Sequence, residues 1–148
     1  MAVNPDLVGR EFAPTAPYLV GREKVREFAR AVFADAPEHT DLEAARALGY
    51  ADLVAPPTFA IVVQELTLRQ LMSEPDSGIV LERTVHGEQR FRWTRPIVAG
   101  DELTARLSVA SVRALGANAM VTSETAITDA DGAHVVTATS VLVIGGAE

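Results

Sequence analysis

The chain has 148 residues, of which 48% are hydrophobic, and its thirteen basic and twenty acidic side chains give a formal net charge of −7. This size and composition are those of one folded domain, residues 1–148, and they exclude a disordered or fibrous protein. The negative charge and the lack of any basic run argue against nucleic acid or an anionic membrane surface as a partner, because such binding needs clustered Lys and Arg.

Cysteine is absent, which excludes disulfides, thiolate nucleophiles and Cys-based zinc sites. The N-terminal residues contain no apolar segment typical of a signal peptide, and no apolar run approaches the ~18 residues of a membrane span. We therefore expect a cytoplasmic protein that does not associate with a membrane.

Helical periodicity dominates the first half of the chain. Apolar residues recur at i, i+3, i+4, i+7 and i+8 from Val25 to Phe33, which predicts a helix that buries one face. Pro37 breaks this pattern. The spacing of Thr40 and Glu43 is that of a capping box, which predicts a second, short helix ended by Gly49. The buried face of the first helix would consist of Val25, Phe28, Ala29, Val32 and Phe33.

A third helix is predicted for residues 58–72, an apolar stretch that the chain enters through Pro56 and Pro57. Proline near the first helical position lacks only an N–H that the first turn leaves unbonded in any case. Because the stretch is apolar on most sides, we expect this helix to lie inside the protein.

After residue 78 the hydrophobic period changes to two, which is typical of β-strands. About four long strands are predicted, separated by turns at residues 100–101, 115–118 and 129–132, and a short strand is expected near Tyr18. The short connections predict antiparallel pairing of consecutive strands. The fold class is therefore α+β, with a curled antiparallel sheet wrapped around the long helix, which is the hot-dog fold. Its edge strands need covering, and a dimer that continues the sheet is the usual solution.

His39 is the histidine whose surroundings best suit acid–base chemistry. It follows Pro37 in a short loop with Asp35, Glu38 and Asp41 nearby, so a base of near-neutral pKa has carboxylates to orient it. The alternative is an exposed loop histidine among helix-capping acids. No second histidine lies at ligand spacing, so we expect neither a metal nor a cofactor.

Three other features bear on chemistry. His86 is expected to be a hydrogen-bonded sheet residue, and His134 a surface residue beside a turn. The free N–H groups at the start of the third helix, around Pro57 and Thr58, could polarise a carbonyl oxygen. The chain contains no Gly-rich phosphate loop, no G-x-S-x-G and no H-E-x-x-H motif.

Six blocks of the sequence, taken in their order along the chain, resemble those of a known family. They are FARA at residues 28–31, DAPEH at 35–39, AARALGY at 44–50, VAPPTF at 54–59, VHGEQ at 85–89 and RPIVAGD at 95–101. Together they resemble the MaoC-like dehydratase family over residues 18–144. The resemblance is to its small members in particular, such as the A subunit of the (3R)-hydroxyacyl-ACP dehydratase of mycolic-acid synthesis.

The resemblance implies a hot-dog fold, a homodimer or heterodimer, and an acyl thioester of CoA or acyl carrier protein as the ligand. Active members carry the motif G-D-x-N-P-x-H, in which Asp and His move the proton and the water. In this chain His39 matches the motif. Phe33 stands at its Gly position, Ala34 at its Asp position and Ala36 at its Asn position, while Asp35 is one residue out of register.

Two hypotheses follow. In the first, the chain is an (R)-specific hydratase or dehydratase that interconverts 3-hydroxyacyl and trans-2-enoyl thioesters, with His39 and Asp35 as the catalytic pair. In the second, it is a non-catalytic, substrate-binding or stabilising subunit of a heterodimeric dehydratase whose partner has the intact motif. A thioesterase is a third option on grounds of fold alone. The predicted substrate-binding residues are Pro57, Thr58, Phe59 and Val62, with Ile61 and Leu66 beside them.

Overall fold

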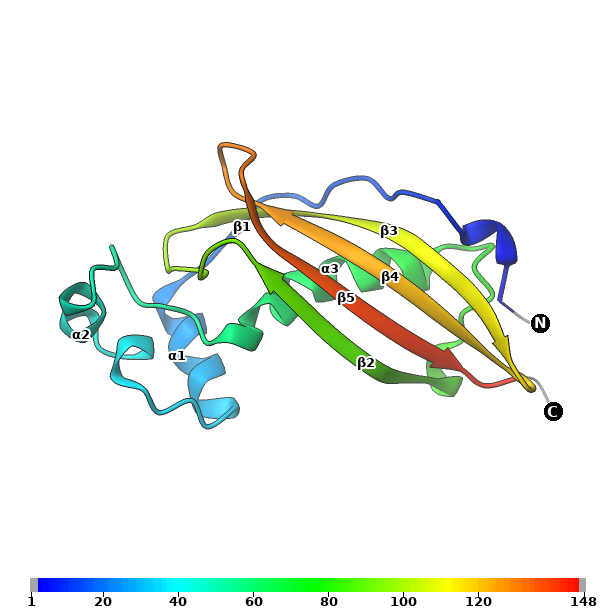
Figure 1. Ribbon diagram of the computed structural model, residues 1–148, viewed down its shortest axis with the longest axis horizontal. Coiled ribbons are helices and arrows are strands. Elements are labelled where there is room, and N and C mark those ends of the chain that lie inside the picture. The colour runs from blue at the N-terminus through cyan, green and yellow to red at the C-terminus, as the bar shows by residue number, and fades with distance from the viewer. Residues whose placement is uncertain (1–2, 147–148) are drawn as a thin grey trace.

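The computed structural model describes residues 3–146, which form a curled antiparallel sheet wrapped around a central helix (Figure 1). The strand order is β1-β3-β4-β5-β2, and α3 runs along the inner side of the sheet. The predicted α+β hot-dog fold is therefore confirmed. The strands are β1 (Tyr18–Leu19), β2 (Thr84–Trp93), β3 (Glu102–Leu115), β4 (Asn118–Thr128) and β5 (His134–Ile144); the α-helices are α1 (Arg22–Ala31), α2 (Leu42–Ala47) and α3 (Ala60–Ser73).

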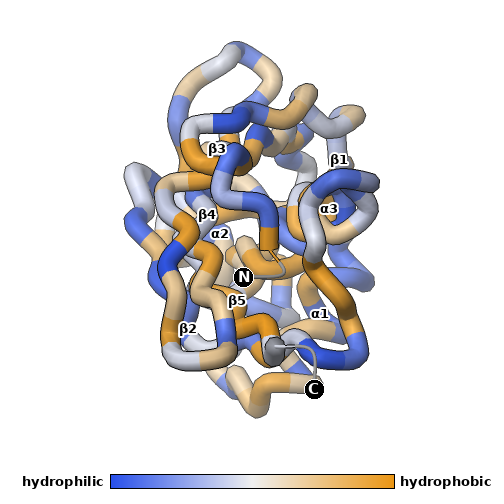
Figure 2. Tube along the Cα trace, turned by 90° about the vertical axis from the view of Figure 1, so that its right-hand side faces the viewer, coloured by the Kyte–Doolittle hydropathy of each residue, from blue (hydrophilic) through white to orange (hydrophobic). Residues whose placement is uncertain are grey.

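The period-two pattern places alternate strand residues against α3. Along β4, every second residue from Ala119 to Ile127 is buried and the residues between them face outward. Figure 2 shows the same alternation of apolar and polar residues along the strands. Burial of the apolar set fixes the register, because a slip of one residue would turn every buried side chain outward.

β2 pairs with β5 at one edge of the sheet, and not with β3, which follows it in the chain. Antiparallel pairing of consecutive strands is thus confirmed for β3 with β4 and for β4 with β5, but it is wrong for β2 with β3. The connection through residues 94–101 is not a tight turn, because it is bound to another segment. Ala55 N donates to Ile97 O at 2.8 Å, and Val54 bridges Val98. The connection therefore carries the chain across to the far edge of the sheet.

α1 ends before the last two apolar residues of its predicted face. Val25 and Ala29 are fully buried, as expected, but Val32 is 43% exposed and Phe33 is 91% exposed. Phe33 has a φ of 57°, in the left-handed region, and this conformation ends the helical path. The predicted burial of Val32 and Phe33 is therefore wrong.

α2 is capped by Asp41, and the predicted capping by Thr40 is wrong. The Asp41 carboxylate accepts from Glu43 N at 2.8 Å and from Ala44 N at 3.3 Å. Thr40 still belongs to the preceding turn, with a ψ of −25°, whereas Asp41 has the extended backbone that an N-cap requires. Gly49, with a φ of 91°, follows the last turn as predicted.

α3 begins at Ala60, two residues later than predicted, because Pro57–Phe59 forms a 3₁₀ turn in front of it. Its sheet-facing side is fully buried, which confirms an internal helix on that side. No helix within residues 3–146 is both long and apolar enough to cross a membrane. The buried residues of α3 are Ala60, Val63, Gln64, Thr67, Leu68 and Leu71.

Candidate active site

His39 ends the 3₁₀ turn Pro37–His39 between α1 and α2, and it is only 8% exposed. Pro37 fixes the backbone at the first position of this turn. The His39 ring nitrogen Nδ1 lies 2.7 Å from Val54 O. A carbonyl oxygen can only accept, so Nδ1 carries the proton, and Nε2 of the neutral ring is the nitrogen that can take up another. The structure therefore holds His39 in the tautomer of a general base.

Val54 belongs to a short extended segment that ties three parts of the chain together. Its N–H donates to Glu38 O at 3.0 Å, which fastens the His39 turn from the other side. Ala55 N donates to Ile97 O at 2.8 Å, and Ala99 N donates to Leu53 O at 2.9 Å. The VAPPTF and RPIVAGD blocks of the sequence thus lie side by side, and the imidazole is anchored to the first of them.

Arg95 clamps the second of these blocks. Its guanidinium donates to both carboxylate oxygens of Asp101, at 2.8 and 3.0 Å, and to Asp129 at 3.3 Å. The hydrogen bonds to Asp101, the largest cause, and to Asp129 raise the pKa of Arg95 above its ordinary value. The backbone N–H of Ala133, followed by Arg95, lowers the pKa of Asp129. These charges remain fixed at neutral pH and hold the connection between β2 and β3 in place.

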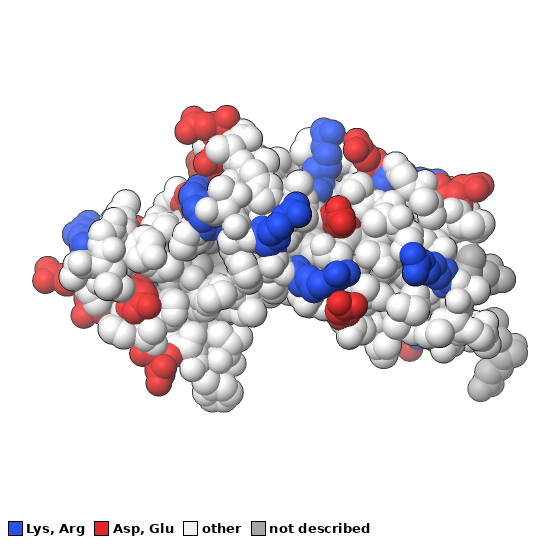
Figure 3. All heavy atoms as spheres, in the orientation of Figure 1, with Lys and Arg blue, Asp and Glu red and all other residues white. Residues whose placement is uncertain are grey.

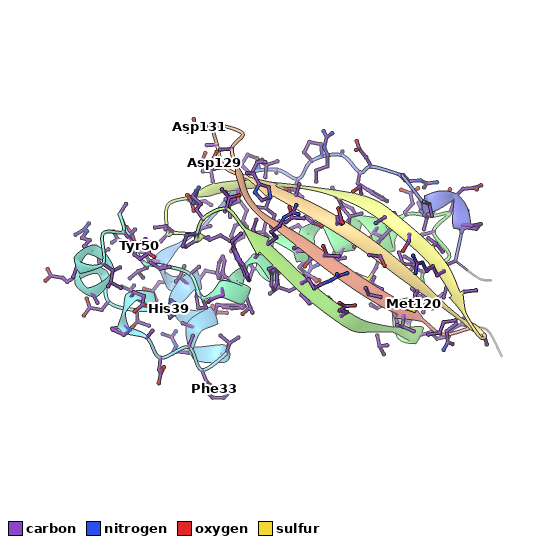
Figure 4. The ribbon with its side chains drawn as sticks, in the orientation of Figure 1. Phe33, His39, Tyr50, Met120, Asp129 and Asp131 are labelled. Atoms are coloured by element: carbon purple, nitrogen blue, oxygen red, sulfur yellow. The ribbon has the colours of Figure 1, made fainter. Side chains whose placement is uncertain are left out.

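A cavity of about 490 Å³ opens where these segments meet. It lies at the end of the molecule where α3 begins, and Figure 4 shows His39 there, far from Met120 at the other end. The cavity brings together the imidazole, the proline-fixed turn in front of α3 and the clamped connection. Its walls are formed by Glu38, His39, Val54, Ala55, Pro56, Pro57, Trp93, Thr94, Arg95, Pro96 and Ile97.

Of the predicted site residues, the structure brings His39 and Pro57 together in this cavity. Asp35 is exposed and does not belong to the cavity wall. Thr58 is also exposed and lies outside the wall, whereas Phe59 is fully buried behind it and Val62 is partly buried against the same core. Figure 4 shows Phe33, at the motif's Gly position, pointing away from His39.

Nine of the eleven residues of the cavity wall were not predicted as site residues, and Glu38, Trp93 and Arg95 are the three of these with the largest bearing on chemistry. Glu38 was considered only as a carboxylate that orients His39, yet it is half-buried and part of the wall. Trp93 and Arg95 flank the end of β2, and the sequence marks them only as the single tryptophan and as the start of the RPIVAGD block. Their distance from His39 along the chain leaves no local pattern that could link them to it.

The other histidines have structural partners. His86 Nε2 lies 3.0 Å from Gln89 Oε1 on β2, next to a β-bulge, as expected for a sheet histidine. His134 opens β5, and its ring nitrogens lie 2.6 Å from Thr94 Oγ1 and 2.7 Å from Thr137 Oγ1. Within the described range 3–146, no group of three or more His, Asp or Glu side chains is arranged to hold a metal ion.

The sequence profile of the FAS1-like dehydratase domain region matches residues 6–138, which is most of the chain. The chain belongs to this dehydratase family. The chain is 64% identical over 146 residues to a UPF0336 protein of Clavibacter michiganensis subsp. michiganensis, covering 99% of this chain and 98% of the relative. This membership confirms the resemblance drawn from the six sequence blocks.

Two solved structures agree with this assignment. The HadBC (3R-hydroxyacyl-ACP dehydratase) complex from Mycobacterium tuberculosis matches this chain with a TM-score of 0.85 and 36% identity, over 93% of this chain and 97% of that chain. A protein described as a MaoC-like dehydratase matches with a TM-score of 0.84 and 38% identity, over 95% of this chain but only 42% of that longer chain. The chain is therefore a hot-dog domain of the dehydratase and hydratase family.

Proposed function

We propose that the protein takes part in the interconversion of 3-hydroxyacyl and trans-2-enoyl thioesters, carried on CoA or acyl carrier protein. In this proposal it is the chain that binds the thioester and holds one half of the acid–base pair. One observation carries it: His39 and Pro57 share a cavity of about 490 Å³, while Asp35 is exposed outside that cavity. Ala34, which stands at the motif's Asp position, has no group that could act as the acid.

The chemistry needs two groups. In dehydration, a base takes the α-proton, the electron pair forms the Cα=Cβ bond, and an acid protonates the departing hydroxyl so that it leaves as water. Nε2 of His39 suits the role of the base, because Nδ1 is committed to Val54 O. Loss of the second group costs on the order of 10²–10⁴-fold in rate. A chain without it would bind the thioester but turn it over slowly alone.

A partner chain could supply the missing acid, and the sheet offers an edge for it. Within residues 3–146, the N-terminal segment covers the side of the sheet formed by β3. There Phe12 N donates to Leu107 O and Thr15 N donates to Ala105 O, both at 2.9 Å. In the described part of the chain, β2 is hydrogen-bonded to β5 alone, and it ends at Trp93 in the cavity wall. We propose that a second MaoC-like chain, one that carries the intact motif, pairs along β2.

Charge favours one direction of approach for an anionic carrier. Figure 3 shows mostly acidic side chains around the α1–α2 end, and several basic side chains, with acidic ones among them, over the strands. A CoA or carrier-protein phosphate would be repelled from the α1–α2 end and attracted to the sheet side, where Arg90 and Arg92 line a shallow groove.

We further propose a cytoplasmic protein with one domain over residues 1–148.

A second candidate is an autonomous hydratase. It is favoured by Glu38, a half-buried carboxyl next to His39 in the same cavity wall, which could replace the motif's Asp. The acid role first predicted for Asp35 would require that loop to rearrange, because Asp35 lies outside the wall.

Hydration of crotonyl-CoA, followed by loss of its ultraviolet absorbance, tests these alternatives. We expect the purified chain alone to be nearly inactive and activity to appear with a co-expressed MaoC-like partner, then to fall at least about tenfold in His39→Gln. Strong activity of the chain alone would refute the subunit proposal. Its loss in Glu38→Gln or in Asp35→Asn would then identify the acid. Release of free CoA in the same assay would instead indicate a thioesterase.

A further inference from the structure

Five polar side chains lie fully buried between α3 and the inner face of the sheet, each with no exposed surface. Two belong to α3, two to β4 and one to β5. Polar groups in such a position are costly unless they are hydrogen-bonded to each other. We call this group the polar seam; it consists of Gln64, Thr67, Ser123, Thr125 and Ser140.

The polar seam divides the core into two apolar clusters. On α3, Val63 belongs to the cluster near the cavity and Leu68 to the cluster at the far end, with the seam residues between them. The strands repeat this order. The site-side cluster includes Phe59, Val63, Ile127 and Val136, and the distal cluster includes Leu68, Leu71, Val121 and Leu142.

The hydroxyls of the polar seam are satisfied, but one amide is not. Thr67 Oγ1 donates to Gln64 O at 2.7 Å and lies 2.9 Å from Thr125 Oγ1, while Ser123 and Ser140 join their hydroxyls at 2.9 Å. Gln64 Nε2 reaches Ala138 O at only 3.4 Å. Gln64 Oε1 has no hydrogen-bond partner in the described part of the chain.

The site-side cluster lies directly behind the cavity wall. Ala55 and Ile97 belong to both, since each forms part of the wall and also packs in that cluster. An acyl chain that extends beyond the cavity from a thioester beside His39 would have to part the packed side chains of this cluster, Phe59 and Val63 among them, and run along α3. From Pro57 to Gln64 the helix advances by about 10 Å, roughly the length of an octanoyl chain.

From this arrangement we infer that the polar seam, with Gln64 at its centre, determines specificity by restricting the acyl group to short and medium chains. The inference rests on the proposed function, because it concerns the acyl group bound at the same cavity. A longer chain would have to displace the seam's hydrogen bonds and would leave several buried hydroxyl and amide groups unpaired, and the loss of several such bonds together outweighs the gain from burying the extra methylenes.

Isothermal titration of the purified full chain with butyryl-, octanoyl- and lauroyl-CoA tests the inference. These saturated thioesters cannot react, so only binding is measured. We expect wild type to bind lauroyl-CoA at least about tenfold more weakly than octanoyl-CoA, and Gln64→Leu to remove this difference. Gln70→Leu is the matched control. Gln70 lies on the same helix and its Nε2 donates to Ala13 O at 3.2 Å, outside the polar seam, so this variant should keep the wild-type order.

Gln64→Met provides a second test if the leucine variant does not fold, as checked by thermal denaturation. Two results overturn the inference while leaving the proposed function intact: lauroyl-CoA bound by wild type as tightly as octanoyl-CoA, or the same order of affinities in the Gln64 variants as in wild type. Failure of wild type to bind any of the three thioesters would refute the proposed function itself, and the inference with it.

Discussion

Replacement of Phe59 by alanine should be among the most destabilising single changes in this chain. Phe59 has no exposed surface and lies at the centre of the site-side cluster. Its ring meets that of Phe28 edge to face, with centroids 5.3 Å apart and planes at 76°. Burial of an aromatic ring is worth about 1.5–3 kcal/mol, and such a ring pair adds about 0.5–1.5 kcal/mol. With the cavity left behind, Phe59→Ala should cost about 3–5 kcal/mol.

Urea denaturation followed by far-ultraviolet circular dichroism measures this loss. In a thermal melt of a chain of about this length, each kcal/mol lowers Tm by about 2–4 °C, so a loss of about 3–5 kcal/mol should lower Tm by about 6–20 °C. Phe59→Leu, which fills most of the space, should lose about 1–2 kcal/mol.

Phe33→Ala is the matched control, because it deletes the same ring from a position that is 91% exposed. We expect it to change the free energy of unfolding by no more than about 0.5 kcal/mol. A loss below about 1 kcal/mol for Phe59→Ala, or equal losses at the two positions, would show that the core does not depend on Phe59 as its burial implies.

Three further predictions concern charge and backbone. Asp101→Asn removes the bidentate partner of Arg95 and should cost about 1–2 kcal/mol in urea denaturation, whereas an unchanged midpoint would contradict the clamp. The hydrogen bond from Arg22 lowers the pKa of Asp52 below its ordinary 3.8, so the stability from this pair is complete above that pH and is lost as the pH falls through the lowered value. Tm measured from about pH 6 to about pH 3 should therefore fall less steeply in Asp52→Asn, and parallel curves would refute this. Phe33→Gly relieves a left-handed backbone and should raise the free energy of unfolding by up to about 1 kcal/mol, whereas a loss of that size would indicate a contact of the ring.

Periodicity predicted the elements of this fold more reliably than their partners. The alternation of apolar and polar residues predicted the strands, because successive side chains of a strand point to opposite faces and only one face is buried. The pairing of β2 with β5 could not be predicted in this way. It depends on hydrogen bonds between residues 53–55 and 97–99, which are more than forty positions apart. The end of α1 was missed for a similar reason, since Phe33 continues the apolar period although its φ of 57° is not helical.

The candidate site was predictable where its chemistry is local and not elsewhere. His39 was found from its proline-stiffened loop, but the group that orients it is the Val54 carbonyl, fifteen residues away, and not one of the neighbouring acids. The resemblance to the family motif favoured Asp35 over Glu38 as the carboxylate of interest, yet of the two only Glu38 forms part of the cavity wall. A shift of a few residues within a loop reverses which side chains face the cavity, and spacing alone does not determine the direction.

The backbone conformation of Phe33 bears on the proposal that two chains share the chemistry. At this position the family motif has glycine, which adopts a positive φ without steric cost, and the chain keeps a φ of 57° with a phenylalanine instead. A left-handed non-glycine residue costs about 1–2 kcal/mol, and a ring that is 91% exposed returns little of this within the chain. The left-handed turn at Phe33, in front of His39, therefore carries an energetic cost. Ala34, at the motif's Asp position, provides no acid. A loop that places His39 in the cavity wall but carries no acid at Ala34 suits the proposed thioester-binding chain, whose partner would complete the chemistry.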